Sequence, residues 1–297
     1  MFLQWDPERG PRELDALAER LHGCPELEPT IVLVDNRSPD APNARNTNAN
    51  LVVGGDNRAW EFSGLEVGVE AGRKSGRPID AWLLVNDRYR ADNRPFLRYL
   101  TGPTVAATCA VGGIVGHIDS YQTEVESFGW TIRQWVTSSF LLMSDLVLRR
   151  SAPLVMVDAQ QLEAILGPPE ETAFKTNGPI GSAHNAYLLD WLTGARRTDL
   201  ATRWYGAAEI DQLDALTLRR KVQSILNEQL LSARAISQGI PLVPIEVAYR
   251  LGALGLDHPV VRREMQLIAS EPTRHPLIRG SRLARLRLAM NVGLRHG

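Results

Sequence analysis

Three short apolar runs, each closed by acidic, amide or glycine residues, constrain the fold of this chain most. The runs span residues 31–34, 51–53 and 82–85, and the residues that close them are Asp35-Asn36, Gly54 to Arg58, and Asn86-Asp87. Short runs of leucine and β-branched residues between turn residues are typical of buried strands. A helical pattern precedes the first run at residues 11–22, and strands that alternate with helices predict a parallel sheet covered on both faces. The sequence therefore predicts an α/β fold with a mostly parallel sheet flanked by helices.

The polar residues that close the runs indicate where a ligand would bind. In an open parallel sheet, ligands lie in the crevice outside the carboxyl ends of the strands. Six residues fall at such ends: Asp35, Asn36, Asn57, Arg58, Asn86 and Asp87. The Gly54-Gly55 pair in the second of these segments would let a ligand approach the backbone closely. We therefore expect a binding site at this edge of the sheet.

Composition excludes several classes of protein. A chain of 297 residues can bury a substantial core, as one elaborated domain or as two domains. Its net charge of -1 argues against binding nucleic acid over the whole surface. Cys24 and Cys109 are too few for a disulfide scaffold or a cysteine metal site, which fits a reducing cytoplasm. No apolar run approaches the roughly 20 residues that span a bilayer.

The chain divides near Tyr205, where helical patterns take over. We expect an α/β domain over residues 1–205 and a helical C-terminal region over residues 206–297. Within the first part, residues 1–5 predict a short edge strand and residues 105–115 a pair of strands rich in small side chains. A helix is expected to follow Ser63, and its glycines recur every four residues, at Gly64, Gly68 and Gly72. This glycine ridge fits tight packing on the sheet or room for a nucleotide equally well.

The C-terminal segment is basic. Residues 262–297 hold eight arginines against two acidic residues, and apolar residues recur there at helical spacing. Such a pattern is compatible with a helix on an anionic membrane surface. A helix packed on the domain with a solvated basic face has the same pattern, and we favour this second interpretation. Peripheral contact with the inner face of a membrane remains an alternative.

The order of the motifs resembles a known enzyme family. Three segments carry the resemblance: residues 34–40 (VDNRSPD), 55–58 (GDNR) and 82–87 (WLLVND). They resemble the nucleotide-sugar glycosyltransferases of GT-A fold, and most closely the large inverting family that includes bacterial rhamnosyl- and other polysaccharide-building transferases. The resemblance covers about the first 150 residues. It implies a Rossmann-like GT-A sheet and a nucleoside diphosphate-sugar as donor substrate.

The resemblance also implies roles for single residues. Asp35 would hydrogen-bond the base or ribose, and Asp87 would hold Mn²⁺ or Mg²⁺ on the diphosphate. The remaining nucleotide-binding positions would be Asn36, Asn57, Arg58 and Asn86. Chemistry agrees, because a metal ion or an arginine beside the departing diphosphate stabilises its developing charge, and Mg²⁺ often takes only one or two carboxylates together with phosphate oxygens.

The sequence departs from the family pattern around Asp87. Val85 replaces an asparagine that is usual in the family, and Arg88 follows the aspartate where a small or apolar residue is more common. The diphosphate could therefore be neutralised by Arg58, Arg88 or Arg90, with the metal held weakly or absent. Asp87 could also be a solvated carboxylate that caps a turn.

The acceptor side is less defined. An inverting transfer needs a base that takes the proton of the acceptor hydroxyl. We rank three candidates for this base, in the order Asp119, His184 and Glu171, and for each a purely structural role is the simpler interpretation. Trp130 and Trp135 are candidates to stack on a sugar ring, and a buried core position suits them equally.

The sequence thus leads to a functional hypothesis and two alternatives. The hypothesis is a glycosyltransferase of bacterial surface glycan synthesis that moves a sugar to a saccharide, lipid-linked or protein acceptor, without a nucleic-acid partner. A nucleotidyltransferase is the second enzyme class, although residues 1–9 lack its glycine-rich basic loop. The third possibility is a GT-A-like binding or assembly module that has lost turnover. A dinucleotide-dependent oxidoreductase is weaker, because Gly54-Gly55 lacks the required glycine spacing.

Overall fold

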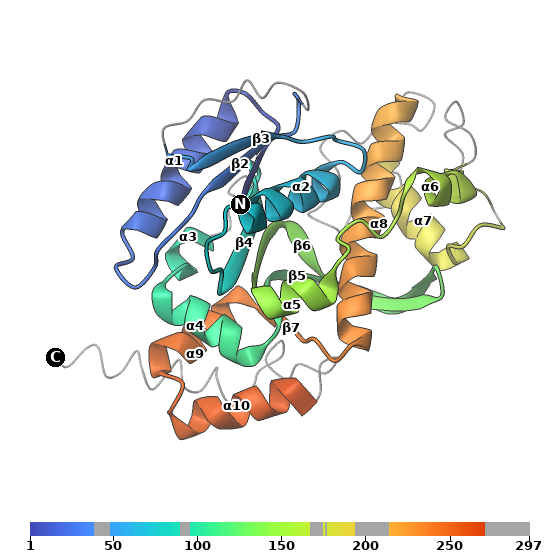
Figure 1. Ribbon diagram of the computed structural model, residues 1–297. Helices are drawn as coiled ribbons and strands as arrows, with labels where there is room; N and C mark the ends of the chain where they lie inside the picture. The colour runs from blue at the N-terminus through green and yellow to red at the C-terminus, as the bar shows by residue number, and fades with distance from the viewer. Residues whose placement is uncertain (39–47, 90–95, 167–174, 176, 194–213, 271–297) are drawn as a thin grey trace.

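A computed structural model describes residues 1–38, 48–89, 96–166, 175, 177–193 and 214–270. The described strands form one sheet in the order β3-β2-β1-β4-β6-β5-β7, with helices on both faces (Figure 1). The strands are β1 (Phe2–Gln4), β2 (Val32–Asp35), β3 (Leu51–Gly54), β4 (Ala81–Asn86), β5 (Ile114–Ser127), β6 (Trp130–Ser144) and β7 (Leu242–Pro244). The helices are α1 (Arg9–His22), α2 (Glu61–Lys74), α3 (Phe96–Tyr99), α4 (Gly102–Val111), α5 (Asp145–Ser151), α6 (Ala159–Leu166), α7 (Ser182–Thr193), α8 (Ala215–Ser237), α9 (Ile245–Leu254) and α10 (Pro259–Ser270).

The sheet is mostly parallel, as predicted. Strands β1 to β4 run in one direction, and β6 pairs antiparallel with both β4 and β5. Strand β7 pairs parallel with β5. Strand β6 therefore runs against the six others. The α/β class with a helical C-terminal region is confirmed, and the arrangement is compatible with a Rossmann-like fold.

The first strand is not at the edge, and this prediction was wrong. Strand β1 pairs with β2 on one side and with β4 on the other. Its residues Phe2, Leu3 and Gln4 are all buried, because helices cover both faces of the sheet at this point. A strand of three residues is too short for its sequence pattern to indicate whether one face of the strand is buried or both.

Successive residues of each strand point alternately into two separate hydrophobic cores. Phe2, Leu33 and Val85 face a core that α1, α4, α9 and α10 complete. Leu3 and Leu84 face the opposite core, which α2, α5 and α8 cover. Because side chains alternate across a strand, one apolar run serves both faces of the sheet.

A third cluster lies beyond the two main cores. It joins the outer half of the β5–β6 hairpin to α6, α7 and most of the length of α8. In Figure 1, α6 and α7 stand at the right, beside α8. Helix α8 thus belongs to two clusters, and it connects the hairpin to the face of the sheet that α2 covers.

Residues 105–115 do not form the expected pair of strands. They contain most of α4 and the start of β5. The Thr101 hydroxyl accepts a hydrogen bond from the Thr104 backbone N–H and so caps the helix, and Gly112 ends it in the left-handed conformation, with φ of 66°. These are ordinary start and stop signals of a helix. They outweigh the small β-compatible side chains that lie between them.

The glycine ridge of α2 packs against the sheet. A Cβ atom on Gly68 would lie 2.8 Å from Val34 Cγ2, and one on Gly72 would lie 2.7 Å from the Trp82 ring. Both distances are shorter than a carbon–carbon contact allows. The glycines therefore bring α2 close to β2 and β4, which confirms the packing interpretation of the ridge.

The expected domain boundary falls within residues 194–213, outside the described residues, so the division stays a prediction. Elements that follow it in sequence take part in the sheet. Strand β7 extends the sheet beyond β5, and α8 packs along β6. The basic segment is described only as far as Ser270, so most of its arginines lie outside the described residues. In the described part of the chain, no helix has both the length and the hydropathy needed to cross a membrane.

Replacing Gly72 tests this packing. Alanine favours a helix over glycine by about 1 kcal/mol, but the added methyl group would press on the buried Trp82 ring. We expect Gly72→Ala to lower the free energy of unfolding by about 1–3 kcal/mol, as overpacking does. Urea denaturation measures this change. Glu70→Ala on the exposed face of the same helix is the control and should have little effect; equal behaviour of the two variants would contradict the packing.

Candidate functional site

The four parallel strand ends converge at a change of direction in the sheet. The chain builds β1, β2 and β3 outward on one side, and then returns to place β4 on the other side of β1. In open α/β sheets, the crevice at such a topological switch point is where ligands bind. Trp5 and Asp6 follow β1, and Asn86 ends β4, followed by Asp87. The residues predicted from the sequence therefore lie beside the switch point.

Asp87 ties the two strands at the switch point together. Its Oδ2 atom accepts hydrogen bonds from the backbone N–H groups of Trp5, at 2.6 Å, and Asp6, at 2.5 Å. The side chain is buried, and burial raises its pKa above the usual range, while the two hydrogen bonds oppose that shift. Oδ1 accepts no hydrogen bond from the described residues. Asp87 is thus a structural cap with one oxygen available.

Asn36 organises the neighbouring loop. Its Nδ2 group donates to Asn57 Oδ1 and to the Trp60 carbonyl, both at 3.1 Å. Its Oδ1 atom is buried and has no partner among the described residues. A Cβ on Gly55 would lie 2.3 Å from this Oδ1 atom. The space at Gly55 is therefore filled by Asn36, not by a ligand as the sequence suggested.

An aromatic pair with one exposed ring, which sequence reasoning missed, lies at the same edge. The rings of Trp5 and Trp60 stack with centroids 5.6 Å apart and planes at 23°. Trp5 is 40% exposed, which is unusual for so large an apolar ring. Trp60 adopts φ of 55° and ψ of -130°, a strained backbone conformation for a tryptophan. Their positions directly after a strand and directly before a helix are the only sequence signal that could have identified them.

One chain of contacts therefore joins the four strand ends. Asp87 binds the backbone of Trp5, Trp5 stacks on Trp60, and the Trp60 carbonyl binds Asn36. Asn36 in turn binds Asn57 in the segment after β3. The structure thus brings three predicted residues, Asn36, Asn57 and Asp87, into one network.

The other predicted nucleotide-binding residues have local partners. Asp35 is fully buried, and its Oδ1 atom lies 3.3 Å from Arg37 Nε. Arg58 pairs with Asp56 at 3.2 Å and with Glu66 at 3.1 Å, while its side chain stays 64% exposed. Asn86 Oδ1 accepts the Arg88 backbone N–H at 3.0 Å. Arginines thus surround the carboxyl edge of the sheet.

The residues at this edge fit a divalent metal only in part. No group of three or more histidine, cysteine, aspartate or glutamate residues suited to a metal occurs in the described parts of the chain. Asp87 Oδ1 is a hard oxygen ligand, and Mg²⁺ can be held by one carboxylate with phosphate oxygens and water. Any metal here would therefore depend on the phosphates of a ligand.

A second polar cluster lies next to the switch point. In the antiparallel pair of β4 and β6, Phe140 lies opposite Val85. Ser138 comes two residues before Phe140 in β6, so it lies just beyond the carboxyl end of β4. Glu61 Oε1 accepts hydrogen bonds from the hydroxyls of Ser138, at 2.9 Å, and Ser224, at 2.8 Å. The Ser138 backbone N–H donates to Glu228 Oε2 at 2.5 Å. Two carboxylates from α2 and α8 thus meet at one serine of β6.

The predicted base candidates lie elsewhere. Asp119 is half exposed on the outer part of β5, where Oδ1 lies 3.1 Å from His117 Nε2. His184 is fully buried in the third cluster, 3.3 Å from the Tyr121 hydroxyl, and burial lowers its pKa to about 4. Glu171 lies outside the described residues. Trp135 is buried against Tyr121, which makes it a core residue.

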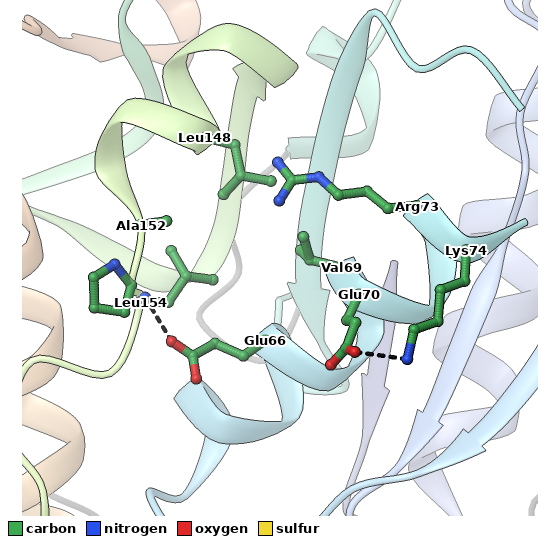
Figure 2. Close-up of a pocket in the computed structure, with 9 residues that line it drawn as sticks. Glu66, Val69, Glu70, Arg73, Lys74, Leu148, Ala152 and Leu154 are labelled. Carbon is green, nitrogen blue, oxygen red and sulfur yellow. Dashed lines mark hydrogen bonds and ion pairs between the residues drawn. The ribbon is translucent and has the colours of Figure 1, made fainter. Parts of the chain in front are cut away.

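A cavity of about 350 Å³ lies away from the predicted site, between α2 and the end of α5 (Figure 2). None of the predicted site residues lines it. Its charged residues are already paired: Glu66 accepts the Leu154 backbone N–H, and Glu70 binds Lys74. Arg73 pairs with Asp145. The cavity therefore offers no uncompensated group that would indicate a ligand.

Comparison with protein-family models, with curated proteins and with solved structures found no match to this chain. We therefore infer the function of the protein from the geometry of the carboxyl edge of the sheet.

Two substitutions at Asp87 test its structural role. Asp87→Ala removes the acceptor of two backbone N–H groups, and an unsatisfied buried donor costs about 1–3 kcal/mol. We expect a clear fall in the thermal midpoint. Asp87→Asn keeps an amide oxygen for the same donors and should be destabilised much less. An equal fall in the thermal midpoint of both variants would show that the negative charge of Asp87, and not its acceptor oxygen, stabilises the fold.

His184 predicts a loss of stability in acid. Its pKa is about 4 when folded and 6.5 when unfolded, so the unfolded state binds the proton first as the pH falls. The free energy of unfolding should therefore decrease from pH 6.5 to pH 4, by up to about 3 kcal/mol from this group. Urea denaturation of the wild type and of His184→Gln at several pH values isolates the contribution of His184 to the free energy of unfolding. An unchanged slope in the variant would exclude His184 as its source.

Proposed function

We propose that this chain is a GT-A-type glycosyltransferase that binds a nucleoside diphosphate-sugar at the carboxyl edge of β1 to β4. The observation that carries the proposal is the network of Asp87, Trp5, Trp60 and Asn36 across the topological switch point. This supports ligand binding at the edge where the sequence motifs fall. The chemistry of the donor follows from the residues that surround it.

Each part of the donor has a suitable partner. The exposed ring of Trp5 can stack on a nucleobase. The family resemblance assigns the base and ribose to Asp35 and Asn36, which are both buried at the end of β2. Arg58 is more exposed than Arg37 and can turn to the diphosphate, exchanging its two surface ion pairs for phosphate oxygens. Asp87 would contribute Oδ1 to Mn²⁺ or Mg²⁺, which would neutralise charge on the departing diphosphate.

The acceptor would be a saccharide, a lipid-linked glycan or a protein. A role in bacterial surface glycan synthesis at the cytoplasmic side follows from the family resemblance. Contact with a membrane surface would involve residues 262–297, most of which lie outside the described residues.

A binding module without turnover is the second candidate. One observation favours it: half of the Asp87 carboxylate is committed to the backbone of Trp5 and Asp6. An aspartate whose main role is structural would leave nucleotide binding in place and provide no metal site. The module and the enzyme therefore differ in their response to metal and in turnover.

A thermal-shift panel tests the donor site. Uridine, guanosine, adenosine and thymidine diphosphates are each added with Mn²⁺, Mg²⁺ or a chelator. A ligand at 100 times its dissociation constant should stabilise the fold by about 2.7 kcal/mol. We expect one nucleotide to raise the midpoint most, with a further rise from metal that Asp87→Asn abolishes. A metal-independent shift would favour the binding module, and no shift with any nucleotide would contradict the proposal.

Trp5→Leu tests the stacking surface. Stacking of a base on an aromatic side chain contributes about 1–3 kcal/mol, so the affinity for the preferred nucleotide should fall by about 5- to 150-fold. Isothermal titration calorimetry measures this change. Trp130→Leu, at the tip of the β5–β6 hairpin, is the matched control and should leave the affinity unchanged. A nucleotide that binds both variants equally would place the base elsewhere.

A further inference from the structure

The carboxylate of Glu228 reaches the carboxyl edge of the sheet from an element far away in sequence. Glu228 lies on α8, is partly exposed, and accepts the backbone N–H of Ser138. Contact with Ser138 places the carboxylate just beyond the end of β4, and Glu61, which directly follows Trp60, contacts the same serine.

A bulge in β6 makes this contact. Gly116 pairs with Leu141 and Ile118 pairs with Val136, so four residues of β6 oppose one residue of β5. The bulge frees the Ser138 N–H from the ladder and turns it toward α8. Bulges of this kind occur next to active sites, where they redirect a side chain or a backbone group.

The environment of Glu228 suits proton transfer at neutral pH. Burial raises its pKa to about 7, and the Glu61 carboxylate on α2 adds to the rise. The hydrogen bond from the Ser138 backbone N–H on β6 and the charge of Lys221 on α8 oppose it. A partly buried carboxylate that titrates near neutrality can accept a proton at neutral pH and later release it.

We propose that Glu228 is the base that takes the proton of the acceptor hydroxyl, with Glu61 and Ser138 as positioning residues. This inference rests on the proposed function. It replaces the three candidates that the sequence suggested. Of these, Asp119 lies on β5 directly after the bulge and pairs with His117, and His184 lies in the third cluster.

The chemical step balances as follows. The acceptor O–H proton moves to the Glu228 carboxylate as the oxygen's electron pair forms a bond to the anomeric carbon of the donor sugar. The bond from that carbon to the diphosphate oxygen breaks, and its electron pair leaves with the nucleoside diphosphate. Glu228 then releases its proton to water. With water as acceptor, the same step is hydrolysis of the donor.

Hydrolysis of the donor therefore tests the inference without an identified acceptor. Sugar release from uridine, guanosine and thymidine diphosphate-sugars is measured from pH 5.5 to 9 in the wild type and in Glu228→Gln. We expect the wild-type rate to rise with pH and level off above about pH 7. Glu228→Gln should lose about 10²- to 10⁴-fold in rate, as removal of a general base does, and keep its nucleotide affinity.

Two further variants control the experiment. Glu228→Asp keeps a titrating carboxyl group, so it should retain part of the rate and the pH inflection even if Glu228→Gln folds poorly. Glu70→Gln removes an exposed carboxylate from α2 and should behave as the wild type.

Four outcomes would overturn the inference. A Glu228→Gln rate within threefold of the wild type, or a wild-type rate without an inflection near neutrality, would exclude Glu228 as the base and leave the donor site standing. A wild type that binds nucleotide-sugars but releases no sugar would likewise indicate that Glu228 and Glu61 have a structural role only. A wild type that binds no nucleotide would remove the proposed function, and the inference with it.

Discussion

The carboxylate of Asp87 is the contact on which the candidate site depends. Strand β1 has only three residues, and the chain beyond it must turn away from the sheet. The N–H groups of Trp5 and Asp6 then need acceptors, because unpaired backbone donors in a half-buried position are costly. Asp87 supplies one oxygen to both, and so fixes the direction in which Trp5 leaves the sheet. The aromatic pair, the Asn36 contacts and the segment after β3 all follow from that direction.

The sequence predicted the part of the fold that local patterns determine. Strands β2, β3 and β4 coincide with the three apolar runs, because each run is bounded by residues that end a strand. Their polar ends converge for a topological reason, since parallel strands expose their carboxyl ends at one edge. This explains why Asn36, Asn57 and Asp87 were recognised together. Their detailed roles were not predictable, because the acceptor and donor of each hydrogen bond come from different strands.

The sequence could not predict contacts between segments that are far apart in the chain. Trp5 and Trp60 are separated by two strands and a helix, and nothing local indicates that their rings stack. Ser138 and Glu228 lie 90 residues apart, and the β6 bulge that joins them depends on pairing with β5. Helix α4 was misread for a different reason: its small side chains suit either structure, and the capping residues decide.

The strain in the segment after β3 is itself an argument for a binding site. Asn57 and Trp60 both have positive φ, at 50° and 55°, and such conformations cost of order 1–3 kcal/mol each. Asn36 binds Asn57 Oδ1 and the Trp60 carbonyl, and the Trp5 ring supports the Trp60 ring, so the surrounding contacts hold the strained backbone in place. A simpler turn would join β3 to α2 without strain and without Trp60 at the edge of the sheet. The conformation brings an indole ring to the switch point, where the proposed nucleotide would bind, and the stability of the fold does not require a tryptophan there.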